Sequence, residues 1–436
     1  MKKLSLYLVC CLCVLLCGCT PSQESIENER IDNNINTESE SYIPHGALNR
    51  LFSVSSSKKV YFSKGNLQYE LNGRKFRFAN NQYDIQQSAV NLSGSNSVLD
   101  YLPYGASGAG STRANSLSSL PTMDIAGTAY DWGLYNPIAN AEDLAGFWRT
   151  LTVQEWEYLL HKRTNADSLN CIVTYNGITG LMLLPDDYQG AAFASLKFTN
   201  KTGDNYYYNN NYPRKKEYIE NKLEYMAYEN LVSLGAVFLP FNSSRTINDE
   251  PIEYYWTSTY SGSNQAHAIL MQKSHLMESA QIITEQSGLS RVRLVQDYPI
   301  ERFVMTFSKS PTTSHQAVLK GIDVNLTIGD KVYFAIYDKE TRGVLNANEA
   351  AKAISKQTGE LTSKWSISKV EGENILNIPE PDGISYQEQY LLGYAVADYV
   401  EDAKYKITYT VTDKNGKTLA KIEKIVPVSV RYPVIN

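Results

Sequence analysis

Cysteine is almost absent from this chain beyond its first nineteen residues. Five of its six cysteines lie within residues 10–19, and only Cys171 remains in the rest of the 436 residues. The sequence therefore excludes an internal disulfide framework, and the folded part must depend on its hydrophobic core. Cys171 lies in the strand-like run Cys-Ile-Val-Thr-Tyr, where we expect a small buried hydrophobic residue, with a reactive thiol as the alternative.

A surplus of positive charge and the common catalytic motifs are also lacking. The formal net charge is -5, so the chain has no basic footprint for nucleic acid. Its five histidines form no His-Glu-x-x-His motif, and no Gly-x-Ser-x-Gly elbow or phosphate loop occurs. Asp186 and Asp187 are adjacent, so on a strand they point to opposite faces and share no site. We therefore expect no nucleic-acid partner, no metal, no cofactor and no catalytic residues.

The N-terminal segment has the layout of a secretory signal peptide. Lys2 and Lys3 form its positive start, and Leu4 to Cys17 form an apolar run of fourteen residues. The alternative, a transmembrane helix, needs about 20 apolar residues, and this run is too short. The sequence Leu-Cys-Gly-Cys at 16–19 resembles the lipobox of bacterial lipoproteins. The resemblance implies that residues 1–18 are removed and that Cys19 carries a lipid anchor in the membrane.

A polar segment follows the anchor. Residues 19–45 hold too few apolar side chains to offset the entropy lost on ordering, so we expect a disordered tether. Acidic residues soon after a lipidated cysteine also resemble the surface-export signal of some Gram-negative lipoproteins. This resemblance implies a lipid-anchored protein at the outer membrane or cell surface.

Residues 46–298 alternate short strands with long loops. Lys59–Tyr69 and Arg74–Ala79 have strand periodicity and are predicted to form a hairpin through Asn72-Gly73. Few helices among many short strands indicate an α+β domain.

Two helices are predicted in this region. Thr152 and Glu155 have the spacing of a capping box at the start of the first helix. The second is predicted over Ile219–Leu234 and ends at Gly235.

Three stretches of this region, in order, resemble formylglycine-generating-enzyme-like domains. Trp148-Arg-Thr-Leu-Thr-Val-Gln-Glu-Trp156 looks like their Trp-Arg-Leu-Pro-Thr-x-x-Glu-Trp motif. Tyr255-Trp-Thr-Ser-Thr259 is similar to their Trp-Ser-Ser-Thr segment, and Ser290-Arg-Val-Arg-Leu-Val295 to their closing Gly-Phe-Arg-Leu-Val strand. The resemblance implies a C-type lectin-like fold over residues 46–298, in a non-catalytic branch of the family.

The chemistry of that family does not carry over to this chain. Its enzymes use two cysteines that bind copper, and Leu231–Asp297 contains no cysteine. The calcium-dependent sugar motif of C-type lectins is also missing, because Asn242 is an isolated oxygen ligand in Leu239-Pro-Phe-Asn-Ser-Ser-Arg245. A calcium site remains an alternative, with Asp249, Glu250 and Glu253 as scattered loop acids.

Loop composition predicts a recognition surface instead. Tyrosine supplies rigid contact area and asparagine supplies adaptable hydrogen bonds, a mixture that binding loops use. Soluble loops without a ligand are the alternative, and Trp256 is expected in the core. The candidate ligand-binding residues are Tyr206, Tyr207, Tyr208, Asn210, Tyr212, Asn242, Arg245, Tyr260 and Asn264.

Residues 299–436 have a different pattern, which begins at Pro299. Strand-like runs recur with turn signals, including Asp413-Lys-Asn-Gly416, and predict an all-β sandwich of immunoglobulin-like type. Ala347–Ser355 is predicted to be a short helix within it.

Taken together, these features predict a non-enzymatic surface lipoprotein that binds a glycan or a protein through loops of residues 46–298. Two alternatives stay open at this point. One is an enzyme of the same fold with a different site, and the other is a structural envelope or pilus-associated component.

Overall fold

The computed structural model describes most of the chain from Tyr42 onward. The described residues are 42–85, 98–110, 112, 120–141, 144–189, 215–216, 220–247, 249–272, 276–277, 282–285, 288–309, 316–318, 324–377, 393–396 and 401–432. Ser39–Asn436 forms one compact unit. The predicted boundary between residues 298 and 299 stays a prediction.

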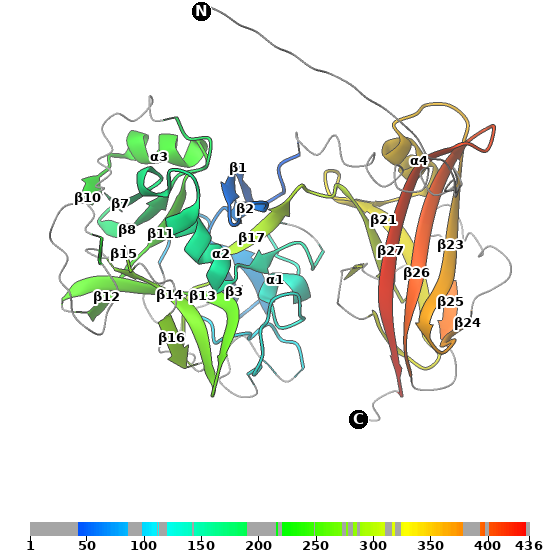
Figure 1. Cartoon of the computed structure of the whole chain (residues 1–436), viewed down its shortest axis with the longest axis horizontal. Coiled ribbons are helices and arrows are strands. Elements are labelled where there is room, and N and C mark those ends of the chain that lie inside the picture. Colours follow the sequence, from blue (N-terminus) through cyan, green and yellow to red (C-terminus); the bar gives the residue numbers. More distant parts are fainter. Residues whose placement is uncertain are drawn as a thin grey trace, which may run out of the picture. The chain divides into compact units, whose positions relative to one another are not determined.

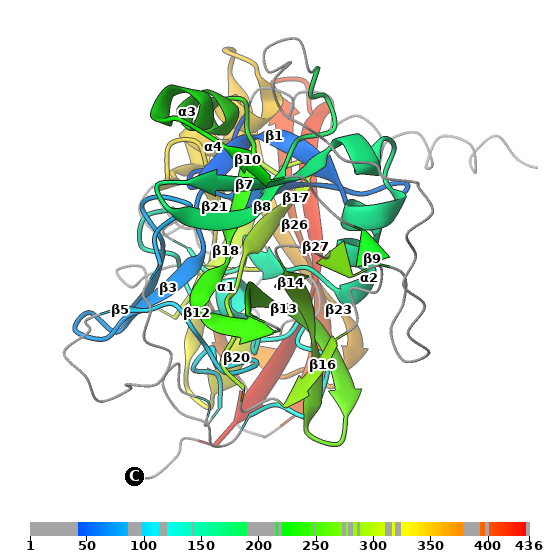
Figure 2. The same cartoon turned by 90° about the vertical axis from the view of Figure 1, so that its left-hand side faces the viewer.

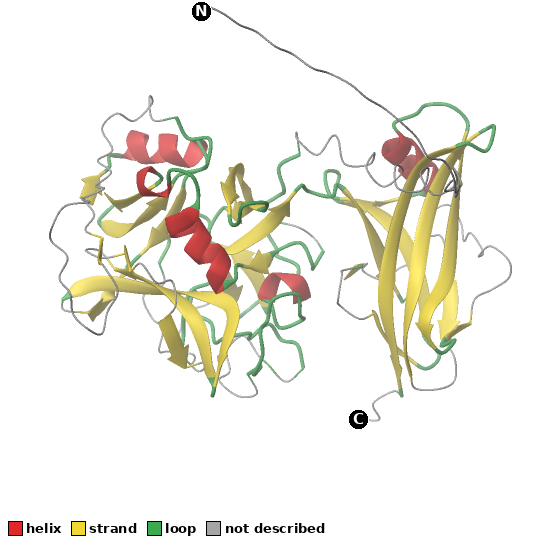
Figure 3. Ribbon diagram, in the orientation of Figure 1, coloured by secondary structure: helices red, strands yellow, loops and turns green. Residues whose placement is uncertain are grey.

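Strands dominate the described chain, with a few helices between them (Figures 1 and 3). The first sheet joins the two ends of the 46–298 region, because Leu294–Tyr298 near the end of the region pairs antiparallel with Lys59–Ser63 near its start. In spatial order it consists of β1 (Ala47–Ser53), β2 (Lys59–Ser63), β17 (Leu294–Tyr298) and β6 (Arg149–Thr150).

The predicted hairpin at Asn72-Gly73 is confirmed. It joins β3 (Leu67–Glu70) to β4 (Lys75–Phe78), and β5 (Val98–Leu99) pairs with β3 on the other side. The predicted continuous strand Lys59–Tyr69 is wrong, because the chain divides into β2 and β3. The division follows from close packing at Gly65, where an added Cβ would lie 2.4 Å from the carbonyl oxygen of Ala79.

A four-stranded sheet packs with helix α3 (Tyr225–Ser233) (Figures 1 and 2). Its order is β10 (Glu220–Lys222), β7 (Asn170–Tyr175), β8 (Ile178–Leu183) and β11 (Val237–Pro240). The predicted start of the second helix is wrong, because Glu220–Lys222 pairs parallel with β7. Its predicted end is confirmed, since Gly235 has φ +85° and its N–H donates to the Val232 carbonyl at 2.9 Å.

A long hairpin organises the next sheet. β13 (Glu250–Gly262) and β14 (Gln265–Gln272) pair antiparallel, and β12 (Asn242–Ile247) flanks β13. The other side of β14 pairs with β15 (Leu276–Met277), which continues to β9 (Lys215–Lys216), and with β16 (Ile282–Glu285).

Large aromatic side chains fill the cores of this region. Trp132, Trp148, Trp156 and Trp256 are all fully buried. Trp256 is therefore a core residue, as predicted, and its indole N–H donates to the Leu102 carbonyl at 2.8 Å. Cys171 is also buried, which confirms the prediction that it is a small core residue.

Residues after Pro299 form two further sheets. One has the order β19 (Gln316–Ala317), β18 (Phe303–Ser308), β21 (Lys331–Asp338), β25 (Gly393–Val396) and β24 (Leu376–Asn377), with β22 (Gly343–Leu345) also on β21. The other has the order β20 (Val324–Thr327), β27 (Thr418–Arg431), β26 (Glu401–Asp413) and β23 (Leu361–Gly372), whose last three strands lie side by side in Figure 1.

Both sheets contribute to one hydrophobic core, which includes Phe334, Trp365 and Tyr405. The predicted helix is confirmed as α4 (Ala347–Ser355), where Asn346 and Glu349 form a reciprocal capping box. The predicted turn at residues 413–416 is also confirmed. The described chain is thus β-rich with few helices, and none of its helices is long and apolar enough to cross a bilayer.

Candidate functional site

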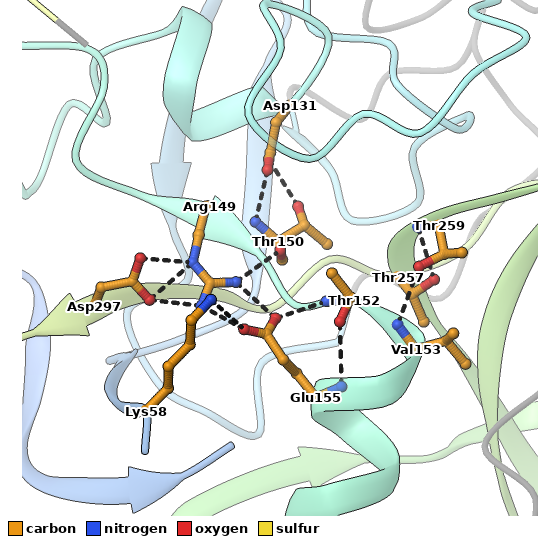
Figure 4. A network of polar contacts seen from close by, with 10 residues as sticks. All are labelled: Lys58, Asp131, Arg149, Thr150, Thr152, Val153, Glu155, Thr257, Thr259 and Asp297. Atoms are coloured by element: carbon orange, nitrogen blue, oxygen red, sulfur yellow. Dashed lines mark hydrogen bonds and ion pairs between the residues drawn. The ribbon is translucent and has the colours of Figure 1, made fainter. Parts of the chain in front are cut away.

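The stretch Trp148–Trp156 forms a structural junction (Figure 4). Thr152 caps helix α2 (Val153–Glu157), which continues as a π-helical turn over Tyr158–Lys162. The Thr152 hydroxyl accepts a hydrogen bond from the Glu155 N–H at 3.2 Å, and the Glu155 carboxylate accepts one from the Thr152 N–H at 2.9 Å. The predicted capping box is therefore confirmed.

Arg149 joins this helix start to strand β17. Its guanidinium donates to Glu155 at 2.7 Å and to Asp297 at 2.9 Å, from different nitrogens. Burial lowers the pKa of Arg149, but the hydrogen bonds that it donates to Glu155 and Asp297 raise this pKa above its usual range. Lys58 lies 4.0 Å from Glu155 on the solvent side. Lys58, Arg149, Glu155 and Asp297 in Figure 4 thus each belong to an ion pair.

Asp131 lies directly before helix α1 (Trp132–Tyr135) and is fully buried. Its two carboxylate oxygens accept hydrogen bonds from the N–H of Thr150 at 2.9 Å and from the Thr150 hydroxyl at 2.8 Å (Figure 4). Burial raises the pKa of Asp131 to about 6, although the bonds from Thr150 act in the opposite direction. Asp131 therefore titrates near neutral pH while it anchors β6.

A second polar network lies wholly inside the 46–298 region. Arg291 donates from Nε to Glu253 at 2.7 Å, and its Nη1 lies 3.5 Å from Asp100. None of these three side chains is exposed to solvent. The two carboxylates therefore balance the buried guanidinium and are not available to a substrate.

Tyr101 connects this network to the surface. Two guanidinium groups pack on its ring, with Arg291 at 4.8 Å and Arg245 at 4.6 Å from the ring centre. Its hydroxyl donates to Glu253 at 2.7 Å and accepts from the Asn242 amide at 2.6 Å. Burial raises the pKa of Tyr101 to about 12. Asn242 thus lies in the interior with its amide engaged, whereas the Arg245 side chain is 27% exposed.

The predicted loop residues Tyr260 and Asn264 lie at the end of the β13–β14 hairpin. Ser263 and Asn264 have φ of 50° and 61°, as a two-residue turn of type I′ requires. Tyr260 is half-buried, and its hydroxyl accepts from the Asn264 N–H at 3.3 Å. Its own N–H donates to the exposed Asp124 at 2.7 Å. Asn264 therefore has a conformational role in the turn, while Tyr260 remains accessible.

Partly exposed side chains also lie on the segment 123–135, which contacts the hairpin end through the hydrogen bond from Tyr260 to Asp124. Met123 is 49% exposed and Tyr135 is 46% exposed, and Tyr130 is half-buried against the same core as Tyr260. Two of these side chains lie against a glycine-rich loop, because Cβ atoms added at Gly108 and Gly110 would lie 3.7 Å from Tyr135 and 3.5 Å from Tyr130. We call Met123, Tyr130, Tyr135 and Tyr260 the tyrosine surface.

The other predicted ligand residues, Tyr206, Tyr207, Tyr208, Asn210 and Tyr212, lie outside the described residues, as does Cys19. Their predicted roles stay predictions.

A cleft of about 290 Å³ lies beside the Arg149 junction. Four charged residues that line the cleft form ion pairs with one another. Arg149 pairs with Asp297, and Lys424 pairs with Glu301 at 3.0 Å. Lys339 lies 4.2 Å from the centre of the Phe147 ring. The charged groups that line the cleft are therefore engaged with other groups of the protein.

Groupings suited to metal or thiol chemistry are also lacking in the described part of the chain. No three His, Cys, Asp or Glu residues of that part are arranged to hold a metal ion. Burial raises the pKa of the Cys171 thiol to about 12, so this side chain is protonated at neutral pH and is a poor nucleophile.

Comparisons with known proteins found no matching family model, no matching curated protein and no matching solved structure.

The buried Arg291 network was not predicted from the sequence. A signal was present in Arg291-Val-Arg-Leu294, where two arginines alternate with two apolar residues. Such alternation would ordinarily indicate one solvent-facing side, but both arginines are buried.

We predict that Asp131 weakens the fold as pH rises. Its folded-state pKa of about 6 exceeds the ordinary aspartate pKa of 3.8, so between these values the folded state binds the extra proton and stability falls with rising pH. The stability advantage of the wild type over Asp131→Asn should therefore shrink by about 3 kcal/mol or less between pH 4 and pH 7. Urea unfolding of both proteins across this range tests it, and a constant difference would contradict it.

A second prediction concerns Glu253. Substitution of Glu253 by Gln removes the carboxylate closest to Arg291 and leaves that guanidinium undercompensated. We expect a loss of about 3–5 kcal/mol in the free energy of unfolding. Glu371→Gln is the matched control, because Glu371 is 65% exposed and pairs with Lys404 on the surface. It should cost less than about 1 kcal/mol, and equal losses in the two variants would refute the assignment.

Proposed function

We propose that this chain is a lipid-anchored protein of the outer membrane or cell surface that binds a glycan or a protein without catalysis. Residues 46–298 would have a C-type lectin-like fold that presents the binding loops. Residues 299–436 would be an immunoglobulin-like sandwich with a spacer or contact role. The observation that carries the proposal is the tyrosine surface, which combines Tyr260 of the β13–β14 hairpin with exposed side chains of the segment 123–135.

The chemistry of this surface suits recognition. Tyr135 and Met123 are close to half exposed, so they offer apolar area that a ligand can cover. Tyrosine rings add polar hydroxyls at low cost in conformational entropy. The nearby Asp124 side chain is exposed and supplies carboxylate oxygen for a hydroxyl or amide of the ligand. Sugars present both apolar faces and hydroxyl groups, so a glycan fits this combination.

The polar interior gives no comparable support to an enzyme. Glu253 and Asp100 are fully buried on Arg291, and Glu155 is occupied by Arg149 and the helix cap. A general acid or base must reach the proton that it transfers. The buried carboxylates named here instead bind arginine side chains and backbone N–H groups of the protein itself.

We predict that Tyr135→Ala weakens ligand binding, by about 2 kcal/mol if Tyr135 is a hot spot. The melting temperature should change little, because the side chain is 46% exposed. A glycan array and a pull-down from envelope extract identify the ligand, and titration of the variants then measures affinity. Tyr432→Ala is the matched control, since Tyr432 is 69% exposed and far along the chain. Equal affinities in wild type, Tyr135→Ala and Tyr260→Ala would remove the tyrosine surface from the site.

The anchor has its own test. Because the lipobox resemblance places the lipid on Cys19, Cys19→Ser should move the protein from the membrane fraction to the soluble fraction. Acyl chains supply the affinity for the membrane, so a variant without them should not stay bound to it. A variant that still sediments with membranes after a high-salt wash would contradict the lipid anchor.

A further inference from the structure

The cleft beside the Arg149 junction has the size of a site for one small molecule. Its volume of about 290 Å³ lies close to the lower end of the range, about 300–1,000 Å³, that ligand pockets occupy. Strands β6 and β17, the segment 299–301, and strands β18, β19 and β27 contribute to its walls. The cleft therefore suits a single compact ligand of about the size of a monosaccharide.

The buried residues of the lining are three aliphatic residues, an amide and an ammonium. They are Ile300, Val304, Val318, Gln296 and Lys339. A ligand group that enters this part of the cleft must cover methyl groups and offer an acceptor to nitrogen donors, because buried polar groups require hydrogen-bond partners.

Gln296 has an unused donor in this buried part. Its side-chain oxygen accepts a hydrogen bond from the Lys339 ammonium at 3.4 Å, which places the carboxamide against a second residue of the same cleft. Its NH₂ group donates to no atom of the described chain, although the residue is only 1% exposed. A buried donor without an acceptor is unfavourable, so a ligand that supplies the acceptor gains affinity. A carbonyl oxygen is such an acceptor.

Two carboxylates lie at the exposed rim of the cleft. The side chains of Asp297 and Glu301 are 57% and 56% exposed. They pair with Arg149 and Lys424, but an ionised carboxylate has about four lone-pair sites, so it can also accept hydrogen bonds from a ligand. The rim therefore favours a ligand whose outer part carries hydroxyl groups.

We propose that this cleft binds an N-acetylated amino sugar. The acetamido carbonyl accepts a hydrogen bond from the Gln296 NH₂ group, and the acetamido methyl packs on Val304 and Val318. The ring hydroxyls donate to Asp297 and Glu301. A sugar without the acetamido group offers no methyl to the aliphatic wall, whereas a peptide amide offers no hydroxyls to the rim.

This cleft and the tyrosine surface consist of different residues. The proposal therefore does not rest on the function assigned to the tyrosine surface, and the two sites can be tested separately.

Titration of the full chain with N-acetylglucosamine, glucose and N-acetylleucinamide tests the class of ligand. We expect N-acetylglucosamine to bind with a Kd on the order of 1 mM, since few atoms are available for contact. Glucose, which lacks the acetamido group, should bind at least about tenfold more weakly. Absence of N-acetylglucosamine binding, or equal affinity for glucose, would overturn the proposal. Tighter binding of N-acetylleucinamide would refute it in favour of a peptide ligand.

Variants test whether binding occurs in the cleft. Gln296→Leu removes the buried donor and should weaken N-acetylglucosamine binding about tenfold. Glu301→Ala removes a rim acceptor and should weaken it about threefold. Glu371→Ala is the matched control, because Glu371 is also an exposed carboxylate paired with a lysine, and it should leave the affinity unchanged. Tyr260→Ala should leave it unchanged as well, which separates the cleft from the tyrosine surface.

Unchanged affinity in both Gln296→Leu and Glu301→Ala would rule out the cleft as the site. If Gln296→Leu failed to fold, Glu301→Ala would decide the question alone, because its side chain lies at the exposed rim.

Discussion

The fold depends on how charged side chains are compensated once they leave water. Burial of an uncompensated charge is so unfavourable that its partners must be held at fixed positions. Arg291, Glu253 and Asp100 meet this requirement, and they come from segments nearly two hundred residues apart in the sequence. This network fixes the closing segment at Arg291 against β13 and the loop at Asp100. Tyr101 then extends it to Arg245 at the surface.

The same constraint explains the stretch that resembles formylglycine-generating-enzyme-like domains. Arg149 pairs with Glu155 inside the motif and with Asp297 at the end of the region. Trp148 and Trp156 are buried on either side. The residues of the Trp148–Trp156 stretch therefore maintain the architecture. Arg293 is the exception to this rule among the described residues, because the partners that its guanidinium contacts are the neutral amides of Asn66 and Gln82.

The paired charges and the tyrosine surface occupy separate parts of the 46–298 region. The paired charges are buried, whereas the tyrosine surface lies on the segment 123–135, which ends in helix α1, and on a hairpin end. Substitutions at exposed positions of that surface therefore leave the ion pairs of the core in place.

Local sequence signals determined the features whose causes are themselves local. The capping boxes at Thr152 and Asn346, the turn at Asn72-Gly73 and the helix end at Gly235 all depend on residues within one or two turns of the chain.

Other features were decided only by tertiary contacts. Glu220–Lys222 became a strand because β7 supplies a parallel edge, although the surrounding pattern favours a helix. Lys59–Tyr69 divides because Gly65 packs closely on the backbone of Ala79. Asn242 was a candidate ligand-binding residue, and its burial and its bonds to Tyr101 and Ser244 follow from the tertiary structure. A sequence pattern records which residues prefer burial, whereas the pairing of buried polar groups depends on which distant segments meet.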